Sequence, residues 1–240
     1  AWDFDLLGLG DAHLVVTTGV DPDESLAWHD ALVPVVDIEP LDLVRAADRI
    51  RRRREVVLRG AATNALYTGI AAIAQPGYVD TSVPLHPARA VADAKAVIPT
   101  DGVVVVDPGV AGLWFARTFP TSVLGSVVVP ATRAPGVAAA LAYAASTRGR
   151  PALAVTTSPL DPVTDAIAAL ARADGTSFVL DAWEPDAPVG PIHEHTQVLA
   201  DGFARGGVAR VRTPVALHRT ADLVEVAGPV VAWGGLDPEE

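Results

Sequence analysis

Three neighbouring hydroxyl side chains, Thr156, Thr157 and Ser158, lie between an apolar run and a helix-like segment. The apolar run, 152–155, has the composition of a buried strand, and the pair Asp161–Pro162 is typical of a helix start. Hydroxyls and backbone N–H groups at a helix start can donate hydrogen bonds to a phosphate. They can equally well cap the helix, because Ser and Thr are common at such positions. The residues alone leave both roles open.

Asp161 is the carboxylate that lies nearest to these hydroxyls in the sequence. At the beginning of a helix, an acidic side chain stabilises the positive end of the helix dipole. A carboxylate is also a ligand that a hard cation such as Mg²⁺ prefers. We expect Asp161 to stabilise the helix, and a role as a metal ligand is the alternative.

Strand-like and helix-like segments alternate along the whole chain. Val-rich runs such as 102–107 are typical of buried strands, and Ala-rich segments such as 136–146 are typical of helices. The segments between consecutive predicted strands contain helices and are long enough for the crossover connections that parallel strands require. The predicted strands are 11–20, 32–38, 55–58, 102–107, 126–129, 152–155, 177–180, 208–211 and 229–233, and the predicted helices are 41–51, 61–74, 87–97, 109–119, 136–146, 161–173, 194–204 and 214–226. We therefore predict an α/β fold of open parallel sheets with helices on both faces, in which ligands lie at the carboxyl ends of the strands.

The alternation indicates two domains. Residues 1–77 form a series of three strands and helices, about half of a doubly wound Rossmann-like domain, which predicts that further sequence precedes Ala1. Residues 78–86 are irregular and are predicted to be a linker. Residues 87–240 contain a complete α/β series and are predicted to be the second domain.

Composition excludes several classes of protein. Of the 240 residues, 50% are hydrophobic and only 5% aromatic, so the core must consist mainly of Ala, Val and Leu. The net charge of −11 argues against nucleic-acid binding, which usually requires a basic surface. The absence of cysteine excludes disulfides and thiolate metal sites. The apolar runs are too short to span a bilayer and no signal peptide is evident, so a soluble, cytoplasmic protein is expected.

Three further motifs favour ordinary structural roles. Gly8-Leu9-Gly10 lacks the third glycine and the preceding strand of a dinucleotide-binding loop, so we interpret it as a connector. His193-Glu194-His195 could contribute ligands to a metal ion, but the sequence has no further histidine pair or cysteine to complete a tetrahedral set of ligands. We therefore favour a solvated helix start for these residues. Arg51–Arg54 suits a solvated helix end, with phosphate binding as the alternative.

Several segments, in their order and spacing, resemble a known family. Residues 99–109 read PTDGVVVVDPG, residues 136–145 form a glycine-led helix of small residues, and residues 151–156 form a strand before the hydroxyl-rich turn. These segments resemble motifs of the thiamine-diphosphate-dependent enzymes of the acetolactate synthase and benzoylformate decarboxylase type. Residues 33–40 and 56–61 resemble the end of the middle domain of those enzymes. The resemblance covers nearly the whole chain and implies a thiamine-diphosphate-binding-like C-terminal domain that uses Mg²⁺.

The resemblance also locates a cofactor site, and the sequence departs from the family there. The implied site residues are Pro135, Gly136, Thr156, Thr157, Ser158 and Asp181. The family holds its metal with the aspartate of a Gly-Asp-Gly motif and a later asparagine, but here 157–159 reads Thr-Ser-Pro and the second position falls near Asp181. A serine hydroxyl lacks the charge that offsets a dication. We therefore expect thiamine diphosphate and Mg²⁺ to bind weakly or not at all, with Asp161 or Asp181 as the metal ligand if a metal binds.

The function that the resemblance implies has two forms. The glutamate that activates the cofactor in this family comes from an N-terminal pyrimidine-binding domain absent from this sequence, so no catalytic residue is assigned. The chain is then either the C-terminal region of an enzyme that makes or breaks C–C bonds of 2-oxo acids, or a non-catalytic pseudo-enzyme or partner subunit that keeps the fold for assembly. The helix 136–146 has almost no polar face. It predicts a homodimer or larger assembly with this helix and segment 107–115 at or near the contact, or pairing with a subunit that carries the missing domain.

Overall fold

The computed structural model describes residues 14–17, 34–39, 42, 44–45, 48, 65–121, 123, 125–131, 133–185 and 194–228. The chain divides into two compact units, Ala1–Gly69 and Ile70–Glu240. This division falls inside helix α4, Ala65–Tyr78, rather than in the predicted linker 78–86. Near the end of that segment, the Leu85 N–H donates to the Pro214 carbonyl at 2.7 Å, so residues beyond α4 are bonded into the second unit.

The first unit contains two short parallel strands. Strand β1, Val15–Thr17, pairs with β2, Val35–Asp37, and both lie inside predicted strands. Residues 42, 44, 45 and 48 are helical, as expected for the predicted helix 41–51. The predicted strand 55–58, the Gly8–Gly10 connector and the Arg51–Arg54 run lie outside the described residues.

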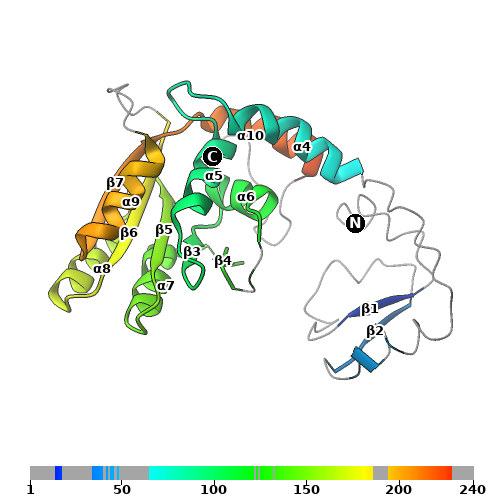
Figure 1. Cartoon of the computed structure of the whole chain (residues 1–240), viewed down its shortest axis with the longest axis horizontal. Helices are drawn as coiled ribbons and strands as arrows, with labels where there is room; N and C mark the ends of the chain where they lie inside the picture. Colours follow the sequence, from blue (N-terminus) through cyan, green and yellow to red (C-terminus); the bar gives the residue numbers. More distant parts are fainter. Residues whose placement is uncertain are drawn as a thin grey trace. The chain divides into compact units, whose positions relative to one another are not determined.

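Five parallel strands form the sheet of the second unit, in the order β4-β3-β5-β6-β7 (Figure 1). The strands are β3 Val103–Val106, β4 Val127–Val128, β5 Ala152–Thr157, β6 Phe178–Glu184 and β7 Val208–Pro214. All four valines of β3 are buried, as expected for a central strand covered on both faces. The parallel pairing of β3 with β5 confirms the predicted fold class.

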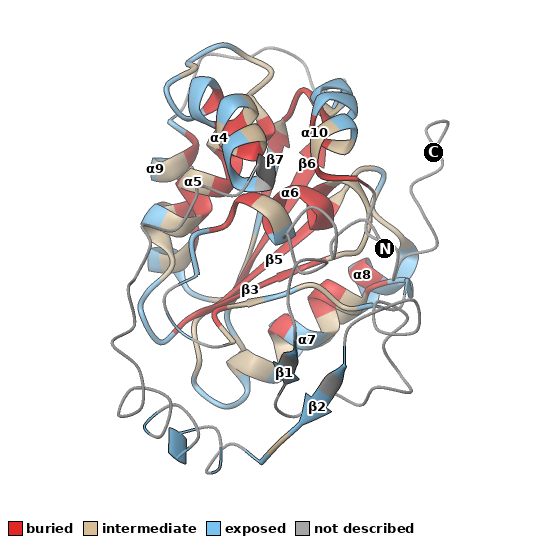
Figure 2. Ribbon diagram, turned by 90° about the vertical axis from the view of Figure 1, so that its right-hand side faces the viewer, coloured by how far each residue is buried: buried red, intermediate tan, exposed pale blue. Residues whose placement is uncertain are grey.

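Helices cover both faces of this sheet (Figures 1 and 2). The chain moves from β3 to β4 in one direction and from β4 to β5 in the other, so right-handed crossovers place the two connecting helices on opposite faces. Helix α7, Val137–Ser146, packs on β3 and β5 beside α8, Pro162–Ala173. Helices α5 Pro87–Val97, α6 Val110–Thr118, α9 His195–Arg205 and α10 Thr220–Ala227 form the layer on the other face. No helix in the described part of the chain is long and apolar enough to cross a membrane.

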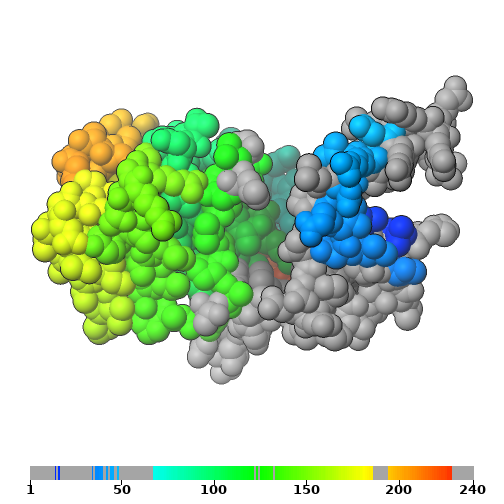
Figure 3. All heavy atoms as spheres, turned by 90° about the horizontal axis from the view of Figure 1, so that it is seen from below, coloured from blue at the N-terminus to red at the C-terminus, as the bar shows by residue number. Residues whose placement is uncertain are grey.

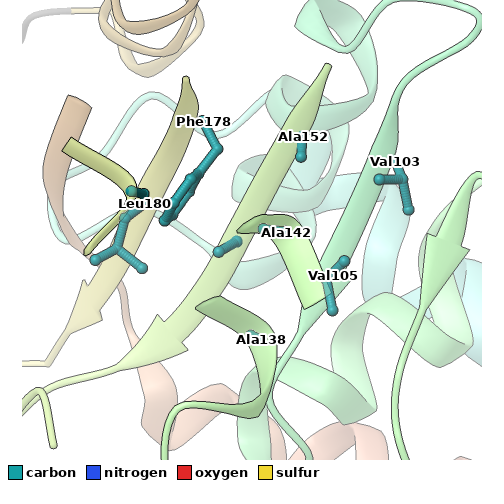
Figure 4. Packing of buried hydrophobic residues seen from close by; sticks show 9 residues of the cluster. Val103, Val105, Ala138, Ala142, Ala152, Phe178 and Leu180 are labelled. Atoms are coloured by element: carbon teal, nitrogen blue, oxygen red, sulfur yellow. The ribbon is translucent and has the colours of Figure 1, made fainter. Parts of the chain in front are cut away.

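Small side chains bring α7 close to the sheet (Figure 4). Ala138 and Ala142 of α7 present only methyl groups to the strands, and both are buried. The cluster beneath them consists of Val103, Val105, Ala152, Ala154, Ala171, Phe178 and Leu180. The low aromatic content of the sequence is therefore matched by close helix–sheet packing of Ala and Val.

Several predicted element boundaries were wrong. Strands β6 and β7 were predicted to end at residues 180 and 211, but they continue to Glu184 and Pro214. Helix α4 was predicted to end at residue 74, but it continues through Pro76 to Tyr78. A proline so close to a helix end removes few hydrogen bonds, so the helix tolerates it. The predicted helix 214–226 begins later, as a 3₁₀ turn η2, Leu217–Arg219, followed by α10. Pro214 instead ends β7, an edge position that proline tolerates, and the Val215 N–H donates to the Glu184 carbonyl at 3.1 Å. The predicted strand 229–233 lies outside the described residues.

Candidate functional site

A cleft of about 410 Å³ lies at the carboxyl ends of β3 and β5. The strand order reverses between these two strands, because β4 lies on one side of β3 and β5 on the other. Such a reversal is where open parallel sheets bind ligands. The lining residues are Asp107, Pro108, Gly109, Val110, Arg133, Ala134, Pro135, Gly136, Thr156, Thr157, Pro159 and Asp161. The cleft therefore lies where the sequence predicted a ligand site.

Most of the predicted site residues lie together here. Pro135, Gly136, Thr156 and Thr157 all line the cleft. Ser158 lies in the same turn, where its backbone N–H donates to the Trp183 carbonyl at 2.9 Å. Sequence reasoning did not assign Asp107 or Arg133 to the site. Asp107 could have been found, because it directly follows the most regular valine strand of the sequence.

Asp161 is the N-cap of α8 and also bonds to the start of α7. Its Oδ1 atom accepts hydrogen bonds from the Val163 and Thr164 N–H groups, both at 2.9 Å. Its Oδ2 atom accepts from the Thr164 hydroxyl at 2.6 Å and from the Gly136 N–H at 3.2 Å. The carboxylate is therefore committed to two helix starts, which agrees with the expected role in helix stabilisation.

Asp107, which follows β3, makes a similar bond to the start of α7. Its Oδ1 atom accepts a hydrogen bond from the Ala138 N–H of α7 at 2.9 Å, and the Thr156 hydroxyl also donates to this carboxylate. Burial raises the pKa of Asp107 above its ordinary value, the two hydrogen bonds oppose that rise, and the nearby Asp161 charge adds to it. Partial burial also acts to raise the pKa of Asp161, but its hydrogen bonds outweigh that effect and lower it. Asp161 is therefore the more firmly ionised of the two carboxylates.

The two carboxylates accept hydrogen bonds from the backbone N–H groups that would otherwise be available to bind a phosphate. At the start of α7, the Gly136 and Ala138 N–H groups bond to the carboxylates, and the Val137 N–H donates to the Ala134 carbonyl at 3.2 Å. At the start of α8, Pro162 has no N–H, and the next two N–H groups bond to Asp161. A helix N-terminus attracts a phosphate through such unbonded donors. Here, the donors are already bonded to the protein.

The residues of the cleft do not fit a metal-bridged diphosphate. The turn presents Thr157, Ser158 and Pro159, none of which carries a carboxylate. Across the ranges that the structure describes, no group of three or more Asp, Glu or His side chains could hold a metal ion. The carboxylates that line the cleft already accept N–H hydrogen bonds from α7 and α8. A divalent cation would have to compete with these bonds for its ligands.

Asp181, the remaining predicted cofactor residue, does not line the cleft. It lies within β6, opposite Val155 and Val211, and is 1% exposed. Its carboxylate accepts a hydrogen bond from the Trp183 indole N–H at 3.1 Å and another from the Thr213 hydroxyl. Asp181 belongs to a buried polar cluster that also includes residues of α5 and α9.

The cluster is centred on His195, for which the expected solvated position was wrong. His195 does begin α9, as expected for a helix start, but it is 6% exposed. Its Nδ1 atom lies 3.2 Å from Asp93 Oδ2, and its Nε2 atom lies 3.2 Å from Asp181 Oδ2. The Arg89 Nε–H donates to Asp93 Oδ1 at 2.7 Å. Local sequence pattern could not reveal this burial, because the partners come from α5 and β6.

The two aspartates keep His195 protonated. Burial alone would lower the pKa of His195, but the charges and hydrogen bonds of Asp181 and Asp93 outweigh it and raise that pKa to about 9. Burial would raise the pKa of Asp93, but hydrogen bonds from His195 and Arg89 outweigh it and lower that pKa. At neutral pH the imidazolium therefore donates from both nitrogens. Both ring nitrogens of His195 are therefore directed at carboxylate oxygens within the protein, Asp93 Oδ2 and Asp181 Oδ2.

Gly136 is required by the backbone at the start of α7. Its φ is +71°, and a Cβ atom there would lie 2.8 Å from Val163 Cγ1 and 3.1 Å from the Thr164 nitrogen. We predict that Gly136→Ala lowers the free energy of unfolding by about 1–2 kcal/mol, because a left-handed conformation with a Cβ is strained. Urea unfolding measures this loss. Gly149→Ala, also at positive φ (+74°) but with no atom within 4 Å of the added Cβ, separates backbone strain from crowding. An unchanged unfolding midpoint for Gly136→Ala would contradict the geometry.

Comparisons with known proteins support the fold. No protein-family model matches the chain, and no curated protein sequence matches it. Among solved structures, the chain is similar to "a putative thiamin diphosphate-dependent enzyme isolated from Mycobacterium smegmatis", with a TM-score of 0.51 and 16% sequence identity. The match covers 84% of this chain and 43% of that one, so the chain spans less than half the length of its structural neighbour. At this identity the likeness establishes a shared fold.

Proposed function

We propose that this chain is a thiamine-diphosphate-enzyme-like protein, similar to the C-terminal region of enzymes of the acetolactate synthase and 2-oxo-acid decarboxylase type. Its own cleft does not hold the cofactor through a metal, and the chain is not self-sufficient for catalysis. The proposal is carried by Asp161, whose carboxylate bonds to the starts of α7 and α8. The fold of the solved neighbour and the motifs in residues 99–109 and 136–145 support the comparison with the family.

The electrostatics of the cleft support weak cofactor binding. A diphosphate would enter a cleft that contains the carboxylates of Asp107 and Asp161, and Arg133 is the cationic residue of the lining. Like charges within a few ångströms of each other repel strongly where water is partly excluded. In the family, a metal ion offsets this repulsion, but Ser158 supplies a neutral hydroxyl where the metal-binding carboxylate is expected.

A role in assembly is the second candidate function. Leu141 and Leu170, on the outer sides of α7 and α8, are 40% and 50% exposed. A fold that keeps its scaffold but has a blocked cleft and an apolar surface fits a non-catalytic pseudo-enzyme or a partner subunit. This alternative needs no cofactor, and a second copy or another subunit would cover the apolar surface.

Calorimetric titration tests the proposal directly. Thiamine diphosphate is added to the chain at neutral pH in millimolar Mg²⁺, and we expect no saturable heat up to millimolar cofactor. Inorganic pyrophosphate, titrated under the same conditions, controls for binding of the diphosphate alone. Saturation at micromolar cofactor would overturn the proposal and would indicate that Asp107 or Asp161 releases its N–H partners to a metal.

A further inference from the structure

Another pocket, of about 330 Å³, lies within the second unit and shares no lining residue with the cleft. It lies between helices α4 and α10, which are seen together in Figure 1. The lining residues are Ala72, Ile73, Pro76, Gly77, Asp80, His86, Arg219 and Asp222. Pockets of this size are at the lower end of the range for small-molecule sites, so a ligand of few atoms would fit.

Helix α4 supplies an uncharged wall of this pocket. Ala72, Ile73 and Pro76 line it, and no residue of α4 is charged. Gly77 completes the wall, because a Cβ atom at this position would lie 2.1 Å from His86 Nδ1. Only glycine therefore lets the imidazole pack directly against the helix. The aliphatic part of a ligand would gain by packing on this wall, since burial of apolar surface is favourable.

His86 adds no positive charge to the pocket at neutral pH. Its Nδ1 atom accepts a hydrogen bond from the Ala88 N–H at 3.1 Å, which places the ring hydrogen on Nε2. Burial lowers the pKa of His86, and the charge of Arg219 lowers it further. The charges of Asp80 and Asp222 act in the opposite direction and are outweighed. Both carboxylates therefore lie close to an imidazole that stays neutral.

Negative charge exceeds positive charge in this pocket. The charged side chains of the lining are two carboxylates and one guanidinium, so one negative charge is left over. Asp222 pairs with Arg219, whose Nη1 atom lies 3.8 Å from Asp222 Oδ2. Asp80 accepts a hydrogen bond from the Ser82 N–H at 2.9 Å. The hydrogen bonds from Ser82 lower the pKa of Asp80, so this carboxylate is ionised at neutral pH. Asp80 is therefore the charge that a ligand would offset.

We propose that this pocket binds a small organic cation, namely a primary ammonium group on a short aliphatic chain. The ammonium group donates to Asp80, and the chain packs on the wall formed by α4. The excess of negative charge repels an anion. A metal ion is a poorer ligand, because the described residues contain no group of three or more Asp, Glu or His side chains that could hold one. The inference does not depend on the proposed function of the cleft.

Saturation-transfer NMR with n-butylammonium as the probe tests the ligand class. The probe is expected to bind saturably with a dissociation constant in the millimolar range, because so few atoms make few contacts. Two ligands of similar size are the controls: 1-butanol is neutral and butyrate is negatively charged. Each should bind about tenfold more weakly or not at all, since neither makes a charge-assisted hydrogen bond to Asp80. No saturable binding of n-butylammonium, equal binding of 1-butanol, or displacement of the probe by Mg²⁺ would overturn the proposal.

Two substitutions with opposite expected effects test the site itself. Asp80→Asn removes the proposed acceptor charge and should weaken binding of n-butylammonium about tenfold. Arg219→Gln removes the positive charge of the lining and should strengthen binding about threefold. A gain in affinity cannot come from a damaged fold, and circular dichroism confirms that each variant is folded. Unchanged binding by Asp80→Asn, or weaker binding by Arg219→Gln, would overturn the assignment.

Asp201→Asn is the matched control for the loss of one acidic charge. Asp201 lies in α9 and pairs with Arg205 at 4.0 Å, and neither residue lines the pocket. Figure 3 shows the atoms of α9, in orange, at the left edge of the molecule, and α9 lies on the same side in Figure 1, away from α4. This variant should bind n-butylammonium as tightly as the natural chain. A loss equal to that of Asp80→Asn would mean that only the overall charge of the protein matters, and this would overturn the proposal.

Discussion

Replacing His195 by leucine is expected to lower the free energy of unfolding by about 3–5 kcal/mol, as observed when one partner of a buried ion pair is removed. The imidazolium lies between Asp93 and Asp181, each 3.2 Å from one of its ring nitrogens. Without it, Asp181 keeps hydrogen bonds from Trp183 and Thr213 but loses its compensating charge. Urea unfolding at pH 7, followed by tryptophan fluorescence, measures the loss, because Trp183 contacts this cluster directly.

The same cluster predicts how stability depends on pH. The folded pKa of His195 is about 9, above the ordinary value of 6.5, so its charge contributes stability fully below pH 6.5. That contribution, about 3 kcal/mol, is lost as the pH rises through 9. Asp93 acts in the opposite sense: its lowered pKa contributes stability that is lost as the pH falls through the folded value. The natural chain should therefore become less stable between pH 6.5 and 9.5, and His195→Leu should lack this slope.

Two further variants separate a charge effect from loss of packing. His218→Gln changes an exposed histidine and should keep both the stability and the pH slope of the natural chain. Asp181→Leu should destabilise about as much as His195→Leu. The double variant His195→Leu/Asp181→Leu should lose less free energy of unfolding than the sum of the two single losses, because neither substitution then leaves the other residue as an unpaired charge. Asp93 still bonds to Arg89 in the double variant. A loss below about 1 kcal/mol for His195→Leu would contradict a protonated, buried role.

The parts of the fold that the sequence predicted depend on local pattern. Four consecutive valines predicted β3, and Pro87 with its cluster of alanines predicted α5 at the bounds that the structure has. The pair Asp161–Pro162 predicted the start of α8, because the cap, the acid and the proline act within one turn. The position of the cleft followed from the parallel order alone, since parallel strands place their carboxyl ends at one edge.

The parts that it could not predict depend on contacts between distant residues. His195 and Asp93 are 102 positions apart, and no local pattern pairs them. The Asp107 carboxylate bonds to an N–H group 31 residues later, so its part in the cleft appears only once β3 and α7 are packed together. Asp181 was assigned to the cleft by its position in a motif. The alternation of side chains along β6 instead directs it to the opposite face of the sheet from α7.

Asp161→Ala is expected to lower the free energy of unfolding by about 2–3 kcal/mol. Loss of a helix cap accounts for about 1–2 kcal/mol, and the buried Gly136 N–H left without its acceptor accounts for the rest. Asp161→Ser keeps a hydroxyl that can cap α8, but this shorter side chain cannot bond to the start of α7 at the same time. The stability of this variant should therefore lie between those of Asp161→Ala and the natural chain. Urea unfolding at pH 7 measures all three.

The same substitution should open the cleft to an anion. Without the carboxylate, the N–H groups of Gly136, Val163 and Thr164 lose their acceptor and converge on one point. Inorganic pyrophosphate should then bind Asp161→Ala at millimolar concentration and raise its unfolding midpoint, because a ligand that binds only the folded state stabilises it. Asp165→Ala is the matched control, since Asp165 lies in the same helix but pairs with Arg210 at 2.6 Å. It should show only the small stabilisation that phosphate salts give to any protein. Equal shifts in the two variants would mean that Asp161 does not occupy the place of a phosphate.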